Sequence, residues 1–206
     1  KVLANLNKYI LSVAGWRTVF AVSGNEEDPS SMVSDEDLVT ASIAAMAFYY
    51  FIGKENPNLL IGVDARPTGT LLLDSVARTL ISLGADVDNI FIASAPEIMA
   101  YSNFGFDGFF YISASHNPIG HNGFKFGRKG GVLAKSECDS VLRVFKELLG
   151  DEDIVKKAID FVDNCPVDKY RRVLLNHNNA KFRSLDYYMD FVIKTASAGP
   201  DFSIPF

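Results

Sequence analysis

Short runs of apolar residues alternate along the chain with longer segments in which apolar residues recur at helical spacing. Runs of roughly four to eight such residues, bounded by Gly, Pro, Asn or Asp, are typical of strands that are covered on both faces of a sheet. This pattern predicts strands at residues 19–22, 59–63, 89–93 and 108–112. A further strand pair is expected at 123–126 and 132–133, joined by a tight hairpin.

Helices are predicted between and after these strands. The clearest one follows Ser34, a hydroxyl residue suited to cap a helix, with acidic residues in the first turn and Gly53 at the end. Residues 2–13 are expected to form a short amphipathic helix or an ordered lead-in. Three further helices are expected: one from Thr68 as cap to about Leu83, a short one opened by Pro96, and one from Ser136 as cap to about Leu149.

The order of these elements indicates the fold class. Strands and helices alternate as βαβαβ from residue 59 to residue 112, which favours parallel pairing with right-handed crossovers. The sequence therefore predicts an α/β protein, a three-layer α/β/α domain with a mostly parallel mixed sheet. Residues 151–206 are expected to add a mainly helical C-terminal segment, with breaks at 165–166 and around 176–179.

Composition narrows the class of protein. The chain has 206 residues, of which 48% are hydrophobic, as in a globular protein. Its net charge of −5 argues against nucleic acid as a partner. No segment is apolar for long enough to suggest a membrane helix, and the first residues do not resemble a signal peptide. Cys138 and Cys165 have neither metal-site nor disulfide-framework spacing, which indicates reduced thiols in a cytoplasmic protein.

The polar loop after the strand at 108–112 carries the strongest sign of chemistry. It reads Ser-Ala-Ser-His-Asn-Pro at residues 113–118, and Asn-Gly-Phe-Lys follows at 122–125. Open α/β sheets bind their ligands at the carboxyl ends of strands. A hydroxyl, an imidazole and an ammonium group on one such loop favour group transfer over simple binding.

This loop resembles the active-site loop of the α-D-phosphohexomutases, the family of phosphoglucomutase, phosphomannomutase and phosphoglucosamine mutase. The family usually has Thr where this chain has Ser113, which exchanges one hydroxyl residue for another, and it has a similar Asn-Gly-x-Lys. The resemblance implies that Ser115 carries a phosphoryl group, which it transfers between C1 and C6 of a hexose phosphate by way of a hexose 1,6-bisphosphate. It also implies that Mg²⁺ is the cofactor and that the phosphate on Ser115 is one of its ligands.

Further site residues follow from the same resemblance. His116 is expected in the active site, Lys125 as a general acid/base or a stabiliser of the transferring phosphoryl group, and Arg66 as the residue that holds the phosphoserine loop. Arg17 resembles the arginine of the family's Gly-x-Arg-Gly, although Thr18 replaces the second Gly; a plain ion pair is an equally good account of it. Asp64 is expected to be a structural partner of the loop or of Arg66, and His121 an ordinary loop residue.

The resemblance covers only the first of the four domains of the family. The Asp-x-Asp-x-Asp metal motif of the second domain is absent from this sequence. Residues 1–206 are therefore interpreted as the N-terminal domain, with 151–206 leading to a missing second domain, and the isolated fragment is expected to be inactive. The alternative is a non-catalytic paralogue that serves as a structural or binding protein. A nucleotide-binding domain is disfavoured because no Gly-x-Gly-x-x-Gly follows the first strand.

Overall fold

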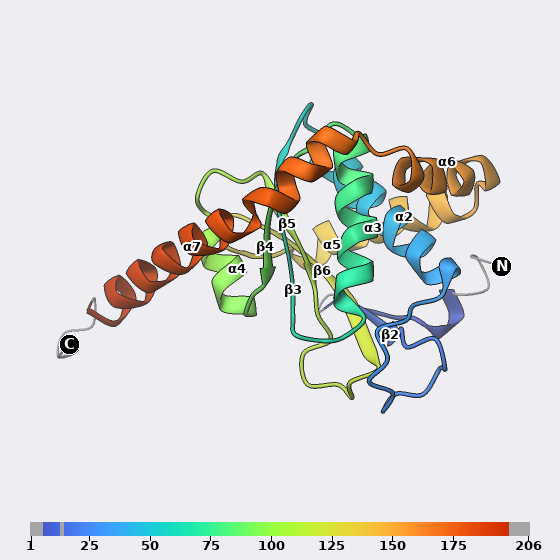
Figure 1. Ribbon diagram of the computed structural model, residues 1–206, viewed down its shortest axis with the longest axis horizontal. Coiled ribbons are helices and arrows are strands. Elements are labelled where there is room, and N and C mark those ends of the chain that lie inside the picture. Colours follow the sequence, from blue (N-terminus) through green and yellow to red (C-terminus); the bar gives the residue numbers. More distant parts are fainter. Residues whose placement is uncertain (1–5, 13–14, 198–206) are drawn as a thin grey trace.

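A seven-stranded mixed sheet lies at the centre of the molecule in the computed structural model, which describes residues 6–12 and 15–197 (Figure 1). The strands follow the order β1-β2-β6-β5-β3-β4, and β7 pairs with β6 outside that path. Their bounds are β1 Ile10–Ser12, β2 Gly15–Val19, β3 Asn58–Val63, β4 Asp86–Ile92, β5 Gly108–Ile112, β6 His121–Arg128 and β7 Gly131–Val132. A short 3-10 turn, η1, spans Leu6–Lys8.

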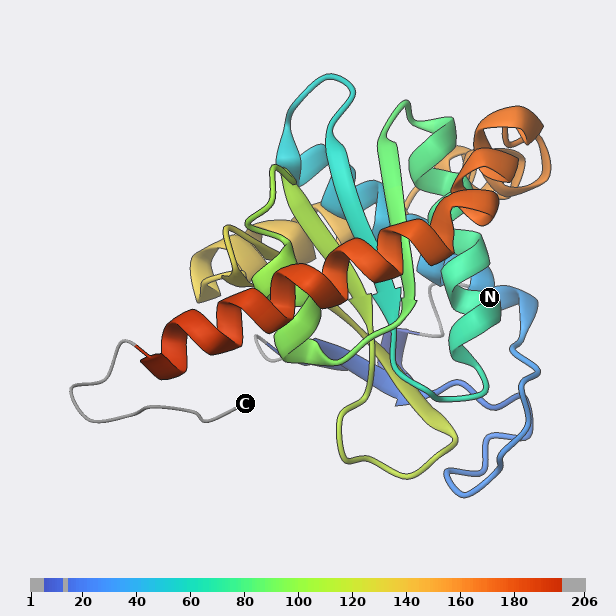
Figure 2. The ribbon, with the colours of Figure 1, turned by 60° about the vertical axis from the view of Figure 1, so that its left-hand side comes forward.

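Helices cover both faces of this sheet, so the expected three-layer α/β/α arrangement is confirmed (Figure 2). The helices are α2 Asp35–Ile52, α3 Gly69–Ser82, α4 Ala95–Tyr101, α5 Lys135–Leu149, α6 Glu152–Asp163 and α7 Val167–Ser197. On one face, α2 packs against α3 and α5 over a large apolar core. On the other, α4 and α7 cover β4, β3 and β5 with a smaller cluster that includes Leu60, Ile98 and Tyr101.

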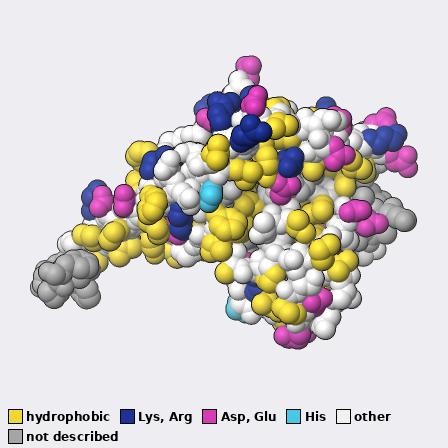
Figure 3. Space-filling model, viewed as in Figure 1, with side chains coloured by type: hydrophobic (Ala, Val, Ile, Leu, Met, Phe, Trp, Pro, Cys, Tyr) yellow, Lys and Arg dark blue, Asp and Glu magenta, His cyan; other side chains and the backbone are white. Residues whose placement is uncertain are grey.

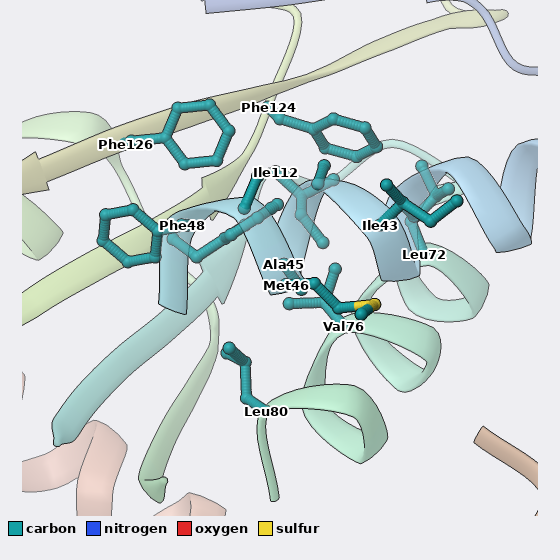
Figure 4. Packing of buried hydrophobic residues seen from close by; sticks show 14 of the residues in the cluster. Ile43, Ala45, Met46, Phe48, Leu72, Val76, Leu80, Ile112, Phe124 and Phe126 are labelled. Carbon is teal, nitrogen blue, oxygen red and sulfur yellow. The ribbon is translucent and has the colours of Figure 1, made fainter. Parts of the chain in front are cut away.

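The larger core shows how strand alternation places the site residues. Phe124 and Phe126 of β6 point into this core, where they meet Phe110 at ring-centroid distances of 5.4 and 5.0 Å (Figure 4). Phe48 of α2 completes the cluster, stacked on Phe126 at 5.3 Å. Because successive side chains of a strand point to opposite faces, Lys125 lies on the other face of the sheet.

Parallel pairing is limited to part of the sheet. Strand β3 pairs in parallel with β4 and with β5, as the βαβαβ pattern predicted. The other pairs among the described strands are antiparallel, so the sheet is mixed but the expectation of a mostly parallel one was wrong. The reason is the short loop after β5, because a connection without a crossover helix returns the chain antiparallel to the strand it leaves.

The start of the chain also differs from the prediction. Strand β2 spans Gly15–Val19, not 19–22, because the N–H groups of Phe20 and Ala21 both donate to the carbonyl of Gly120, at 2.9 and 3.1 Å, and leave the ladder. Within 2–13, the described part forms η1 and β1 and no α-helix. The hairpin between β6 and β7 is confirmed, with Lys129 and Gly130 at φ 51° and 77° between the paired Arg128 and Gly131.

Helix starts were predicted less well than helix positions. The prediction for α2 is confirmed, with the Ser34 hydroxyl accepting from the N–H of Asp37 at 3.2 Å. Ser136 lies inside α5, which begins at Lys135; the carboxylate of Glu137 there accepts from the N–H of Ala134 at 2.8 Å. Thr68 precedes α3 but makes no capping bond.

The described part of the C-terminal segment, up to Ser197, is mainly helical, and its first break is where it was expected. Residues 198–206 of the predicted segment lie outside the described residues. Helix α6 ends before Cys165 and Pro166, but α7 runs without interruption through 176–179. Ala180 and Ser184 of α7 are buried against the body of the domain, and the Ser184 hydroxyl donates to Glu97 at 2.6 Å. This packing outweighs the low helix propensity of the asparagines in that region.

The last turns of α7 extend beyond the sheet and carry exposed apolar side chains (Figure 3). Despite this apolar surface, no helix within the described part of the chain is long and apolar enough to cross a membrane. Cys138 and Cys165 are both buried and neither forms a disulfide bond, and burial raises the pKa of each thiol.

Candidate active site

The predicted site residues come from neighbouring strand ends at one edge of the sheet. Residue Arg66 follows β3, and the loop with Ser115 and His116 connects the end of β5 to the start of β6. Since β3 and β5 are parallel neighbours and β6 returns antiparallel to β5, these ends all meet at one edge. The sheet therefore brings Arg66 next to Ser115, although the two residues are 49 positions apart in the sequence.

Arg66 holds the loop by its backbone. Its guanidinium donates from Nη1 to the carbonyls of Pro118 and His121 and from Nη2 to those of Ser115 and Asn117. Its Nε donates to Asp64 at 3.2 Å. These bonds use all five N–H donors of the side chain, so Arg66 has no donor left for a ligand in this arrangement. Arg66 is therefore a positioning residue for the loop.

Asp64 completes this clamp, in agreement with the structural role expected for it. Its carboxylate accepts from the backbone N–H of Arg66 at 3.1 Å and from that of Ala114 at 3.3 Å. A carboxylate between an arginine and two amides fixes the exit of β3 relative to the exit of β5.

Ser115 lies at the tip of this loop in an uncommon backbone conformation. Its φ is 58°, in the left-handed region that residues other than Gly seldom adopt, and such strain is found at functional sites. The backbone N–H of Ser115 donates to Oγ of Ser113 at 3.1 Å, so the hydroxyl that replaces the family's Thr supports the turn. The Ser115 side chain is exposed, and its Oγ accepts from Nζ of Lys125 at 2.7 Å.

Lys125 is held half-buried beneath the loop. It lies opposite Tyr111 across the β5–β6 ladder, with Nζ 5.7 Å from the centre of that ring. Burial lowers the pKa of Lys125, the charge of Asp64 opposes this shift, and the charges of Arg17 and Arg66 add to it. A lysine with a lowered pKa is neutral more often at a given pH, which suits an amine that accepts or returns a proton.

Arg17 faces the same region from β2. It is paired with Gly123 of β6, and a Cβ on that glycine would lie 2.8 Å from Cγ of Arg17, so the absence of a side chain at 123 makes room for Arg17. Its Nε is buried and without a hydrogen-bond partner. The ion pair considered for Arg17 is not present among the described residues, where no salt bridge includes it.

The two histidines of this region have different surroundings. His116 is exposed next to Ser115, and within the described residues its ring has no hydrogen-bond partner. His121, expected to be a loop residue, is the first residue of β6 and pairs with Val19. Its Nε2 lies 3.2 Å from a carboxylate oxygen of Glu26.

Several residues that support the site were not found by sequence reasoning. Asn122 donates from Nδ2 to Oγ1 of Thr68 at 3.0 Å, which joins the start of β6 to the start of α3. Glu26 accepts by its carbonyl from the N–H of Gly120 at 2.7 Å, which joins the loop at 20–34 to the Ser115 loop. The contact of Asn122 has a signal in the sequence, because this residue is the Asn of the Asn-Gly-x-Lys motif. The contact between Glu26 and Gly120 has no such signal.

The described residues do not form a magnesium site by themselves. They include no group of three or more His, Cys, Asp or Glu side chains arranged to hold a metal ion. The nearby carboxylate, that of Asp64, is already bonded to Arg66 and two backbone amides. A phosphorylated Ser115 would offer one oxygen, whereas Mg²⁺ prefers six oxygen ligands, so the remaining protein ligands would have to come from elsewhere.

Comparison with known proteins identifies the family. Residues 20–148 match the family described as phosphoglucomutase/phosphomannomutase, alpha/beta/alpha domain I, and the chain belongs to this family. It is 34% identical over 126 residues to a phosphoglucomutase/phosphomannomutase from Thermococcus kodakarensis, a match that covers 54% of this chain and 28% of that protein. A phosphoglucosamine mutase from Clostridium tetani is 31% identical over 150 residues, covering 64% of this chain and 33% of that protein.

A solved structure supports the same fold. A protein from Thermus thermophilus aligns with a TM-score of 0.53 at 18% identity, over 67% of this chain and 30% of that one. The chain thus spans about a third or less of the length of these relatives. The helices α6 and α7 lie after the matched residues 20–148.

Proposed function

We propose that this chain supplies the phosphoserine-bearing first domain of a phosphohexomutase, and that Ser115 is the residue that carries the phosphoryl group. The proposal is carried by one observation: Nζ of Lys125 lies 2.7 Å from Oγ of Ser115, at the tip of a loop that Arg66 holds by four carbonyls. A nucleophile in contact with an amine of lowered pKa, exposed at a strand end, is an arrangement suited to phosphoryl transfer.

The two half-reactions assign a proton to Lys125. When a hexose bisphosphate phosphorylates the enzyme, Oγ of Ser115 forms a bond to phosphorus and the bond from phosphorus to the sugar oxygen breaks. Neutral Lys125 takes the Oγ proton, and solvent water protonates the released sugar oxygen. When phosphoserine donates, a sugar hydroxyl attacks phosphorus and gives its proton to solvent water, the bond between phosphorus and Oγ breaks, and the ammonium of Lys125 returns a proton to Oγ. Burial of Lys125 and its proximity to Arg17 and Arg66 support this exchange, because they increase its neutral fraction.

Arg17 is proposed to bind a phosphate group of the substrate. It carries a buried Nε without a partner, and its charge acts on Lys125. A guanidinium with free donors matches the geometry of phosphate oxygens. His116, exposed beside Ser115, is proposed to orient the sugar. We propose glucose or mannose phosphate as the substrate and Mg²⁺ as the cofactor, with ligands besides the Ser115 phosphate supplied by downstream domains of the same polypeptide.

Phosphate mapping tests this proposal. The chain is incubated with glucose 1,6-bisphosphate and Mg²⁺, and intact mass followed by peptide mapping locates the phosphate. We expect one phosphoryl group, on Ser115, and none in Ser115→Ala. Ser136→Ala is the matched control, because Ser136 lies in the first turn of α5 and should leave the modification unchanged. Phosphate on Ser113 or Ser136, or no phosphate on any residue, would contradict the assignment.

A further inference from the structure

A cavity lies between α3, β4 and α7, and the Ser115 loop takes no part in it. Its volume is about 230 Å³, and Leu73, Ala77, Phe91, Val173 and Leu174 supply most of its wall. Helix α7 supplies one side of it, and this helix begins beyond the residues that match the family. One wall of the cavity therefore comes from a part of this chain that the catalytic proposal does not use.

One buried polar side chain in this cavity has a hydrogen-bond donor without a partner. Asn89 of β4 is only 6% exposed, and its Oδ1 accepts from the N–H of Phe91 at 2.8 Å. That bond fixes which side of the amide is oxygen and which is nitrogen. Nδ2 then has no hydrogen-bond partner in the described part of the chain, and Asn89 lines the cavity. Nδ2 is not among the fully buried unpaired atoms of the described residues, so it still reaches solvent, and an acceptor on a ligand in the cavity would take the place of water there.

The charges around the cavity are already balanced. The carboxylate of Asp74 accepts from Nε of Arg78 at 2.9 Å and from the hydroxyl of Tyr170. The guanidinium of Arg78 lies over the ring of Tyr170, 4.1 Å from its centre. Burial, together with the bond to Asp74, raises the pKa of Tyr170 to about 12, so its hydroxyl stays a donor to Asp74 at neutral pH. A ligand with a net charge would therefore find no free counter-charge in this pair.

We propose that this cavity binds a small neutral compound that consists of one ring and one carbonyl oxygen, with the oxygen accepting from Nδ2 of Asn89. An apolar cavity of about 150 Å³ suffices for benzene, so 230 Å³ leaves room for a ring with a short substituent. The ring would contact Leu73, Phe91 and Leu174, and the ligand would hold α7 against α3 and β4. This inference is independent of the proposed phosphoryl transfer.

Two probes of similar shape separate the ring from the carbonyl. Acetophenone has both, and cumene replaces the carbonyl by an apolar carbon. The isotope-labelled chain is titrated with each probe, and the amide chemical shifts are measured by NMR. Acetophenone should cause saturable shifts at Asn89, Phe91 and His177, and none at Ser115 or Lys125. Absence of saturable shifts, or shifts confined to the Ser115 loop, would overturn the proposal.

Three variants test the contacts. Leu174→Trp should abolish binding, because an indole there fills the cavity or covers its mouth; Leu175→Trp is the matched control, since Leu175 is 75% exposed and does not line this cavity. Asn89→Asp keeps the acceptor for Phe91 but loses the free donor. This variant should weaken the binding of acetophenone by about 5- to 20-fold and change the affinity for cumene by less than about 2-fold. Unchanged binding in Leu174→Trp, or equal losses for both probes in Asn89→Asp, would contradict the proposed contacts.

Discussion

At the scale of single residues, the arrangement around Ser115 depends on one arginine. The left-handed conformation of Ser115 is intrinsically unfavourable, by about 1–2 kcal/mol. Arg66 offsets this cost, because it binds the carbonyls of residues 115, 117, 118 and 121 at once. A planar group with five fixed donors can do this, whereas the compact ammonium of lysine cannot.

Replacement of Arg66 by lysine should therefore release the loop. We expect Arg66→Lys to lower the rate of Ser115 phosphorylation by more than about tenfold, because the nucleophile is no longer held against Lys125. Loss of these part-buried bonds should cost about 1–3 kcal/mol of unfolding free energy, or roughly 2–12 °C in Tm. Mass spectrometry and calorimetry measure the two effects. Arg143→Lys, on the exposed face of α5, is the control and should change neither the phosphorylation rate nor the stability. If Ser115 is phosphorylated in Arg66→Lys at the wild-type rate, Arg66 does not hold the loop as proposed.

The charge of Arg17 should be visible in the titration of Lys125. Burial lowers the pKa of Lys125 below its ordinary value of 10.5, and the positive charge of Arg17 lowers it further. Arg17→Gln removes that charge, so the pKa of Lys125 should rise toward 10.5 and the neutral fraction at pH 8 should fall. Carbon NMR of isotopically methylated lysines follows the titration. Arg143→Gln should leave the value unchanged, and a pKa that stays constant or falls in Arg17→Gln would show that Arg17 does not act on Lys125.

Sequence reasoning predicted that the candidate site residues lie together, but not which bonds hold them. Ser115, Lys125 and Arg66 stand in recognisable motifs, and the strand pattern was sufficient to place them at one edge of the sheet. The bonds from Arg66 to backbone carbonyls could not be predicted, because every residue has a carbonyl and only the folded path of the loop selects four of them. His121 was misassigned for a related reason: whether it belongs to the loop or to β6 is set by its pairing with Val19.

At the scale of elements, β2 must approach β6 closely for Lys125 to reach its position. Gly15 begins β2 at φ 126°, and a Cβ there would lie 3.0 Å from Cγ of Lys125 and 3.1 Å from the carbonyl oxygen of Phe124. Both the backbone conformation and the contact therefore require glycine. The glycine of the sequence motif thus has a packing role that is separate from that of Arg17.

Substitution of this glycine should disturb both the strand and the lysine. We expect Gly15→Ala to cost about 1–3 kcal/mol of unfolding free energy, from the strained backbone and the short contact. It should also slow phosphorylation of Ser115, because Lys125 is displaced. Gly131→Ala is the matched control: it lies in β7, has no left-handed φ, and a Cβ there would meet nothing within 4 Å. Denaturant unfolding compares the two, and equal stability of both variants would contradict this account.

Helix α7 shows where element prediction failed. The asparagines around residue 178 have low helix propensity, and a break was expected there. The helix continues because Ala180 and Ser184 are buried and Lys181 donates to Glu97 at 2.6 Å. These contacts join residues more than eighty positions apart, so no local window of sequence contains them. By contrast, the break at Cys165 and Pro166 is local, since a proline restricts the residue before it, and it was predicted.

At the scale of the whole molecule, the sheet explains why Ser115, the proposed nucleophile, is accessible. Helices α4 and α7 cover β4, β3 and β5 on the face of Lys125 (Figure 2). Ser115 and His116 are exposed at the edge of the sheet. The chain spans about a third or less of the length of the two relatives compared above.

Full catalysis by this chain should therefore be much weaker than a single phosphorylation event. In the proposed mechanism, Ser115, Lys125 and Arg17 carry out one slow transfer to Ser115. Repeated turnover also requires that the bisphosphate reorient without leaving and that water be excluded, and the exposed loop provides neither. The described residues also lack a cluster of carboxylates that could hold Mg²⁺. A coupled assay of glucose 1-phosphate conversion, with bisphosphate activator and Mg²⁺, should give a rate at least about 10⁴-fold below that of a complete phosphohexomutase. Phosphorylated Ser115 in the same sample is the control for a competent fold, and turnover at the rate of a complete enzyme would refute the assignment of this chain as one domain of a larger mutase.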